Sequence, residues 1–131
     1  MSVALPDLDL SRLDIMDLGT LWRQLHEISL PLQRIVDEDP CTKARPDELL
    51  SDLTAVGVSL DEIWVWLHKQ RWRIPDEMRG RNPSDASERE DRNMVLLSAA
   101  VEGGEFPEGV AALAATLANE AAAARRKQVR A

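Results

Sequence analysis

The stretch from residue 46 to residue 73 constrains the fold most, because it carries two helix-period patterns separated by a glycine. Pro46 suits the first position of a helix, where its missing N–H would have no partner. Apolar residues then recur at steps of three and four. Gly57 supplies a left-handed stop, and Ser59 with Glu62 forms a capping box that begins a second helix. The stretch therefore predicts a helical hairpin with a tight turn.

The turn, Gly57-Val58-Ser59 followed by Ile63, resembles the turn and second helix of helix-turn-helix DNA-binding proteins over about twenty residues. The resemblance implies a transcriptional regulator, antitoxin-like in joining a DNA-binding centre to an acidic region that binds a partner. A plain helical hairpin packed in a core is the alternative.

The rest of the chain also shows helical periodicity and no strand-period segment of note. It predicts an all-α fold, a compact bundle of about four to six helices around the central hairpin. With 131 residues the chain is long enough for one domain, 1–131, with a modest core. Within it we expect an extended arm at 1–10, a polar loop at 74–84 and a basic tail at 125–131.

Local patterns predict further helix boundaries. Gly19 is expected to end a short first helix and Thr20 to cap the next one. Pro31 predicts a kink or a split in that second helix. Residues 85–102 are expected to form a helix, and Pro107 to open the last one.

Apolar residues in the N-terminal third alternate at steps of three and four, which is the spacing of a heptad seam. The seam spans less than three heptads and is interrupted by Pro31, so a long coiled coil is not expected. Residues 18–35 instead predict a helix in a bundle, with a homodimer through this segment as a second hypothesis. The seam consists of Leu18, Leu21, Leu25, Ile28, Leu32 and Ile35.

Three of the four tryptophans lie close together, interleaved with cationic residues. Trp and Arg are enriched in the energetic centres of protein interfaces, and aromatic and basic side chains together can also hold nucleic acid, here through residues 66–81. Alternatively, Trp66 and Trp72 cover a second core face. An acidic cluster at the predicted helix end could meet a basic partner. The expected partner-binding residues are Trp64, Trp66, Lys69, Arg71, Trp72 and Arg73 with Asp37, Glu38 and Asp39.

The charge balance restricts the partners. The net charge is −7, with a sequence pI of about 4.8, which disfavours nucleic acid and anionic membranes. One cysteine, Cys41, excludes an internal disulfide and favours a reducing, cytoplasmic location. Asp7 and Asp9 interrupt the N-terminal segment, so no secretory signal is expected.

No catalytic set is evident in the sequence. The two histidines, His26 and His68, do not lie in ligand-spaced motifs, and no phosphate-binding glycine loop occurs. We therefore expect no enzyme activity, no cofactor and no metal. The sequence predicts an acidic helical module that docks onto a larger protein or nucleoprotein assembly, as a small inhibitor or an accessory subunit. A helix-turn-helix regulator is the alternative function.

Overall fold

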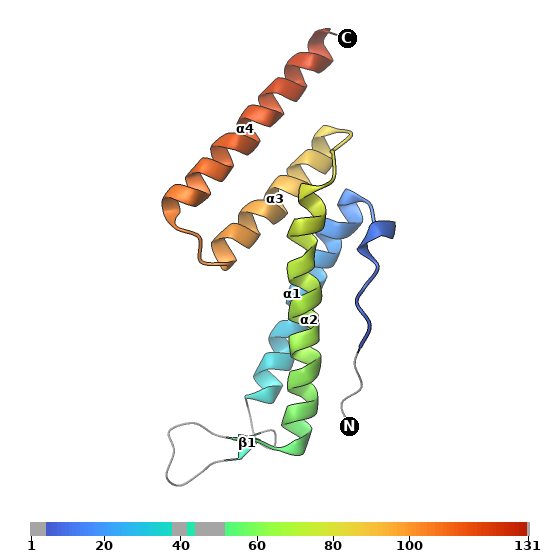
Figure 1. The fold of residues 1–131 in the computed structure, drawn as a ribbon, viewed down its shortest axis with the longest axis vertical. Helices are drawn as coiled ribbons and strands as arrows, with labels where there is room; N and C mark the ends of the chain where they lie inside the picture. The colour runs from blue at the N-terminus through green and yellow to red at the C-terminus, as the bar shows by residue number, and fades with distance from the viewer. Residues whose placement is uncertain (1–4, 38–41, 44–51, 131) are drawn as a thin grey trace. The chain divides into compact units, whose positions relative to one another are not determined.

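The computed structural model describes residues 5–37, 42–43 and 52–130 (Figure 1). Four α-helices make up most of this part of the chain, which confirms the predicted all-α class at the lower end of the expected helix number. In chain order the elements are η1 (Leu10–Arg12), α1 (Ile15–Val36), β1 (Thr42–Lys43), β2 (Asp52–Leu53), α2 (Ala55–Arg79), α3 (Ala86–Glu102) and α4 (Pro107–Arg130). The strands β1 and β2 are two residues each and pair antiparallel.

The chain divides into two compact units. Unit 1 consists of Met1–Asp9 and Thr20–Arg73, and unit 2 consists of Leu10–Gly19 and Ile74–Ala131. The helices α1 and α2 therefore contribute residues to both units. None of the helices in the described ranges is long and apolar enough to cross a membrane.

Helix α1 begins at a reciprocal cap and continues through two residues that were expected to interrupt it. The Asp17 N–H donates to Asp14 Oδ1 at 2.8 Å, and the Asp14 N–H donates to Asp17 Oδ2 at 3.4 Å. The predicted end at Gly19 and cap at Thr20 are wrong, since both residues lie inside one helix. Pro31 also lies inside the helix rather than between two helices. Pro31 removes one backbone hydrogen bond from the helix, and this loss is accommodated because Pro31 is exposed to solvent.

The predicted hairpin turn at Gly57 is wrong, because α2 runs without interruption from Ala55 to Arg79. Thr54, not Ser59, caps this helix: its Oγ1 accepts a hydrogen bond from the Gly57 N–H at 3.2 Å. The Ser59 hydroxyl donates to the Ala55 carbonyl at 3.1 Å, as in a helix interior. Gly57 is buried, and among the described glycines only Gly104 has a positive φ, so the left-handed stop is not formed.

The first helix of the predicted hairpin is not found either where the structure describes the chain. Residues 52–53 belong to β2, whereas 46–51 lie outside the described residues. The predicted polar loop at 74–84 begins only after Arg79, because residues 74–79 form the last turns of α2. Ile74 and Met78 are fully buried there. This burial offsets the backbone bond that Pro75 removes from the helix.

Unit 2 contains the helices whose boundaries the sequence predicted well. Asp85 caps α3 by accepting the Glu88 N–H at 2.8 Å, and Gly103 closes it. Gly104 follows at φ 79°, and α4 opens at Pro107 as predicted. The predicted basic tail is helical over residues 125–130, at the end of α4. The adjacent α3 and α4 run in opposite directions (Figure 1).

One face of α3 contributes to the core of unit 2. Val95, Leu96 and Ala99 are buried, together with Leu117 of α4. Arg81, just after α2, forms hydrogen bonds with the backbone at η1. Its NH1 donates to the Leu13 carbonyl at 2.7 Å and its NH2 to the Leu10 carbonyl at 3.0 Å. The Leu10 carbonyl also accepts the Leu13 N–H at 3.2 Å, so Arg81 adds a second hydrogen bond to this 3-10 turn.

Candidate functional site

The predicted Trp/Arg cluster lies on α2 within unit 1, but its members do not form one exposed surface. Arg71 is only 4% exposed. Its Nε donates to the Trp22 carbonyl at 3.0 Å, and its guanidinium carbon lies 3.5 Å from the centroid of the Trp22 ring. A buried cation needs such compensation by a hydrogen bond and a ring face. Arg71 therefore ties α1 to α2 and is removed from the accessible surface.

Trp72 also contacts Trp22. Its ring meets the buried Trp22 ring edge-on, with centroids 5.6 Å apart and an interplanar angle of 89°. Such edge-to-face contacts stabilise by about 1 kcal/mol beyond the area they bury. Trp72 is 37% exposed, so part of its side chain is accessible to solvent.

The other predicted residues hold the N-terminal arm against α2. Trp66 Nε1 donates to the Pro6 carbonyl at 3.1 Å. Arg73 NH1 donates to the Leu8 carbonyl at 2.9 Å, and Lys69 Nζ lies 3.8 Å from Asp7 Oδ1. The predicted extended arm is thus non-helical over residues 5–9 and docks on its own chain.

Gln70, which was not among the predicted partner-binding residues, is the central residue of this contact. Its side chain is fully buried. Its Oε1 accepts from the Leu8 N–H at 2.8 Å and from Arg73 NH1 at 2.7 Å, while its Nε2 donates to Asp7 Oδ1 at 2.9 Å. The sequence held one sign of this role, because Gln70 lies in line with the apolar residues Ile63 and Leu67 of the helix. A polar side chain at such a position is buried only when its hydrogen bonds are satisfied.

The arm contact lowers the pKa of Asp7 below its ordinary value of 3.8. The hydrogen bond from Gln70 is the largest cause of the lowered pKa, and the charge of Lys69 is the next; desolvation opposes them, and Arg73 lowers the pKa further. The carboxylate is therefore the form that the docked arm favours.

Trp64 faces a different neighbour. Its ring lies 4.0 Å from that of His68, centroid to centroid, with 39° between the planes. The Trp64 indole N–H is buried and has no hydrogen-bond partner in the described part of the chain. Of the predicted acidic cluster, Asp37 is exposed directly after α1, whereas Glu38 and Asp39 lie outside the described residues. Partner binding by any of these residues remains a prediction.

The accessible apolar surface of unit 1 lies elsewhere than predicted. On α1, Ile28 is 52% and Ile35 is 50% exposed, although Leu25 of the same seam is buried. On α2, Val56 is 58% and Ile63 is 42% exposed. The heptad spacing in the sequence predicted that Ile28 and Ile35 form part of an apolar seam. Nothing in the sequence indicated that these two residues would remain exposed.

The structure offers no inorganic site in the ranges it describes: no three His, Cys, Asp or Glu side chains are grouped so that they could hold a metal ion. Comparison with known proteins gives no identification, since no family model matches the chain and neither the curated proteins nor the solved structures contain a match.

Proposed function

We propose that the protein is a non-enzymatic, acidic helical interaction module that docks onto a larger protein or nucleoprotein assembly, as a small inhibitor or an accessory subunit. The observation that carries the proposal is the exposure of apolar side chains on both helices of unit 1: Ile28 and Ile35 on α1, and Val56 and Ile63 on α2.

The two exposed α2 residues continue a row that is buried further along the same helix. Val56, Ile63, Leu67 and Gln70 are separated by seven, four and three residues, so they share one side of the helix. Leu67 and Gln70 are buried, whereas Val56 and Ile63 are not. The row is thus covered at one end and open at the other.

The two exposed α1 residues behave in the same way. Ile28 and Ile35 are one heptad apart, beside the buried Leu25, Ser29 and Val36. Exposed apolar residues that line one side of a helix are typical of a protein-binding surface. With Asp37 exposed next to them and a net charge of −7, the fitting partner has an apolar groove with a basic rim.

The test is a co-purification from host lysate with nuclease present, followed by binding measurements with the purified partner. Ile63→Asp should weaken binding by about tenfold or more, because a carboxylate would be buried against the partner. Val65→Asp is the matched control, since Val65 is also β-branched and exposed but lies about 200° around the helix. Equal effects of the two variants, or recovery of no protein partner, would contradict the proposal.

A charge reversal tests whether the acidic cluster contributes. Changing Asp37, Glu38 and Asp39 together to Lys should abolish binding if the module occupies a basic, nucleic-acid-binding groove of its target. An unchanged affinity would exclude that form of the proposal and leave docking through the exposed apolar residues.

A second copy of the chain is the other occupant that the α1 face supports, as in the predicted homodimer through residues 18–35. Sedimentation equilibrium distinguishes the two. A homodimer should dissociate in Ile35→Asp and persist in Leu30→Asp, because Leu30 is exposed to a similar degree on another side of α1. A monomer at all concentrations would leave only a different protein as partner.

A further inference from the structure

A pocket in unit 2, between α3 and α4, combines an apolar wall with two arginines. Its volume is about 550 Å³, within the range of small-ligand sites. Helix α3 contributes Arg89, Glu90, Asn93, Met94 and Leu97, and α4 contributes Arg125. Two alanines complete the wall. We propose that this pocket binds an amphipathic monoanion, a carboxylate with an extended hydrocarbon chain.

The sequence builds the pocket from a second face of α3. The α3 residues of the lining are spaced by one, three and four, so they share a side of the helix. The core of unit 2 uses another side, with Val95 and Ala99 buried. On α4, the small Ala121 lies one turn beyond the buried Leu117. A small side chain at that position leaves the space that the pocket occupies.

The charges in the pocket favour one negative charge on the ligand. Arg89 and Arg125 carry two positive charges against one on Glu90, which leaves a net charge of +1. Neither guanidinium has an ion pair or a hydrogen-bonding side-chain partner in the part of the chain that the structure describes. Arginine presents a planar set of donors that matches a carboxylate.

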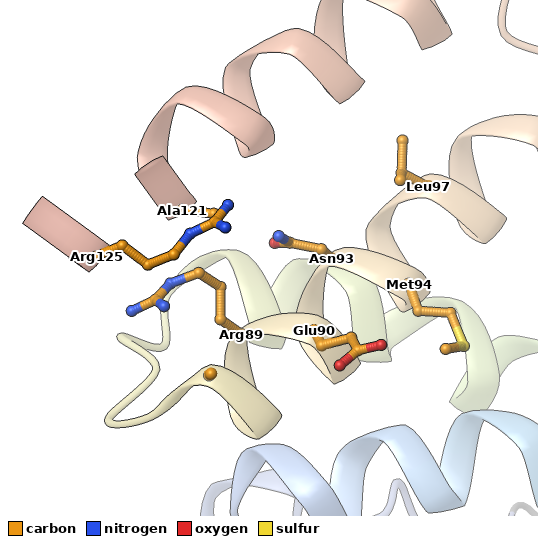
Figure 2. A pocket seen from close by; sticks show the side chains of 8 residues that line it. Arg89, Glu90, Asn93, Met94, Leu97, Ala121 and Arg125 are labelled. Atoms are coloured by element: carbon orange, nitrogen blue, oxygen red, sulfur yellow. The ribbon is translucent and has the colours of Figure 1, made fainter. Parts of the chain in front are cut away.

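The two arginines lie apart from Met94 within the pocket. Figure 2 shows Arg125 of α4 and Asn93 of α3 with their polar ends on the same side as Arg89, while Met94 and the Glu90 carboxylate lie on the other side. Asn93 Oδ1 is buried and has no hydrogen-bond partner among the described residues. This amide oxygen needs a donor, which a carboxylate does not supply, so the position of the ligand's charged head is set by Arg89 and Arg125 alone.

The apolar wall has room for a chain. A second depression of about 350 Å³ is lined by Leu97, Ser98, Val101 and Glu102, and it shares Leu97 with the first. From Arg89 to Val101 the helix rises about 18 Å. A hydrocarbon chain that starts at the arginines can therefore lie along Met94, Leu97 and Val101, which excludes a compact ion such as inorganic phosphate as the best ligand.

The test is a calorimetric titration of the full chain with decanoate, acetate and decyltrimethylammonium. Decanoate should bind in a one-to-one complex, and both acetate and the cation should bind at least about tenfold more weakly, because one lacks the chain and the other has the wrong charge. Shortening the carboxylate should weaken binding by about two- to fourfold for each CH₂ removed.

Two variants of adjacent residues provide the matched comparison. Arg125→Gln should weaken decanoate binding by about tenfold. Arg126→Gln removes the same charge from the same helix but is outside the pocket lining, so it should leave binding nearly unchanged. Unchanged melting temperatures of both variants establish that the fold is retained. Absent binding of decanoate, equal binding of the cation, or an equal loss in both variants would overturn the proposal.

Discussion

At the scale of single residues, buried polar side chains do much of the positioning in unit 1. Gln70 and Arg71 are adjacent on α2, and both are buried, yet they serve different neighbours. Gln70 holds the backbone and a side chain of the arm, and Arg71 holds the Trp22 carbonyl and ring. Arg71 was predicted to bind a partner because Trp and Arg are enriched in the energetic centres of protein interfaces. Its compensation comes from a carbonyl 49 residues away, which no local pattern indicates.

The arm contact makes a specific prediction for the pH dependence of stability. Because the folded-state pKa of Asp7 is lowered from 3.8, its contribution is fully present above that pH and is lost as the pH falls through the folded pKa. An NMR titration of the Asp7 carboxyl should give a midpoint below 3.8, and Trp66 fluorescence should report release of the arm at lower pH. Asp7→Asn should remove this transition, whereas Glu62→Gln, which changes an exposed carboxylate on α2, should retain it.

Gly19 makes a prediction about close packing within unit 2. A Cβ at this buried position would come within 2.8 Å of Asp91 Cγ and closer still to its Oδ2. Gly19→Ala should therefore lower the free energy of unfolding by about 1–3 kcal/mol, because Asp91 is itself buried and has little room to move. Gly80→Ala is the control, since its Cβ would meet only the Glu77 carbonyl at 3.6 Å. Urea denaturation curves that shift equally for both variants would contradict this account.

At the scale of elements, capping and stop residues predicted some helices accurately and misplaced others. Gly103 closes α3 and Pro107 opens α4 as expected, whereas α3 begins at Ala86, one residue after the predicted start, with Asp85 as its cap. Gly57 and Pro75 were read as breaks, but both are buried inside α2. A glycine or proline costs a helix roughly 1–3 kcal/mol, which the burial of a few apolar side chains exceeds. Glycine and proline therefore ended a helix only where the packing of the flanking residues did not favour its continuation.

Pro31 tests this balance within α1. Since it is exposed, its ring contributes little packing, while it removes a helix hydrogen bond. Pro31→Ala should raise the free energy of unfolding by about 1–3 kcal/mol. The melting temperature should rise with it. Pro75→Ala should bring a smaller gain or a loss, because Pro75 is buried and its removal leaves a cavity. A destabilised Pro31→Ala variant, measured by thermal denaturation, would contradict this account.

At the scale of the whole molecule, the basic side chains closest to the predicted DNA-binding segment are bound to the protein's own backbone. Arg71, Arg73 and Arg81 donate to carbonyls of Trp22, Leu8, Leu10 and Leu13. The net charge of −7 adds a general repulsion of phosphate. The helix-turn-helix geometry that suggested DNA binding is absent from α2.

These observations predict weak binding to nucleic acid. At physiological salt, fluorescence anisotropy with a short labelled duplex should give a Kd weaker than about 100 μM. Arg73→Ala should affect the stability of the arm contact and leave this weak binding unchanged. Tight, salt-dependent binding that Arg73→Ala abolishes would restore the DNA-binding regulator as the preferred function.

The sequence by itself determined the all-α class, the acidic charge and the boundaries of α3 and α4, because periodicity, charge and end caps act over a few neighbouring residues. The tertiary structure decided the continuity of α2, the burial of Gln70 and Arg71, the exposure of Ile28 and Ile63, and the pairing of Arg89 with Arg125 in one pocket. Each of these depends on which segments, distant in the chain, cover a given face. The free energy gained when distant segments bury a face exceeds the helix preferences of single residues. It depends on contacts that exist only in the folded chain.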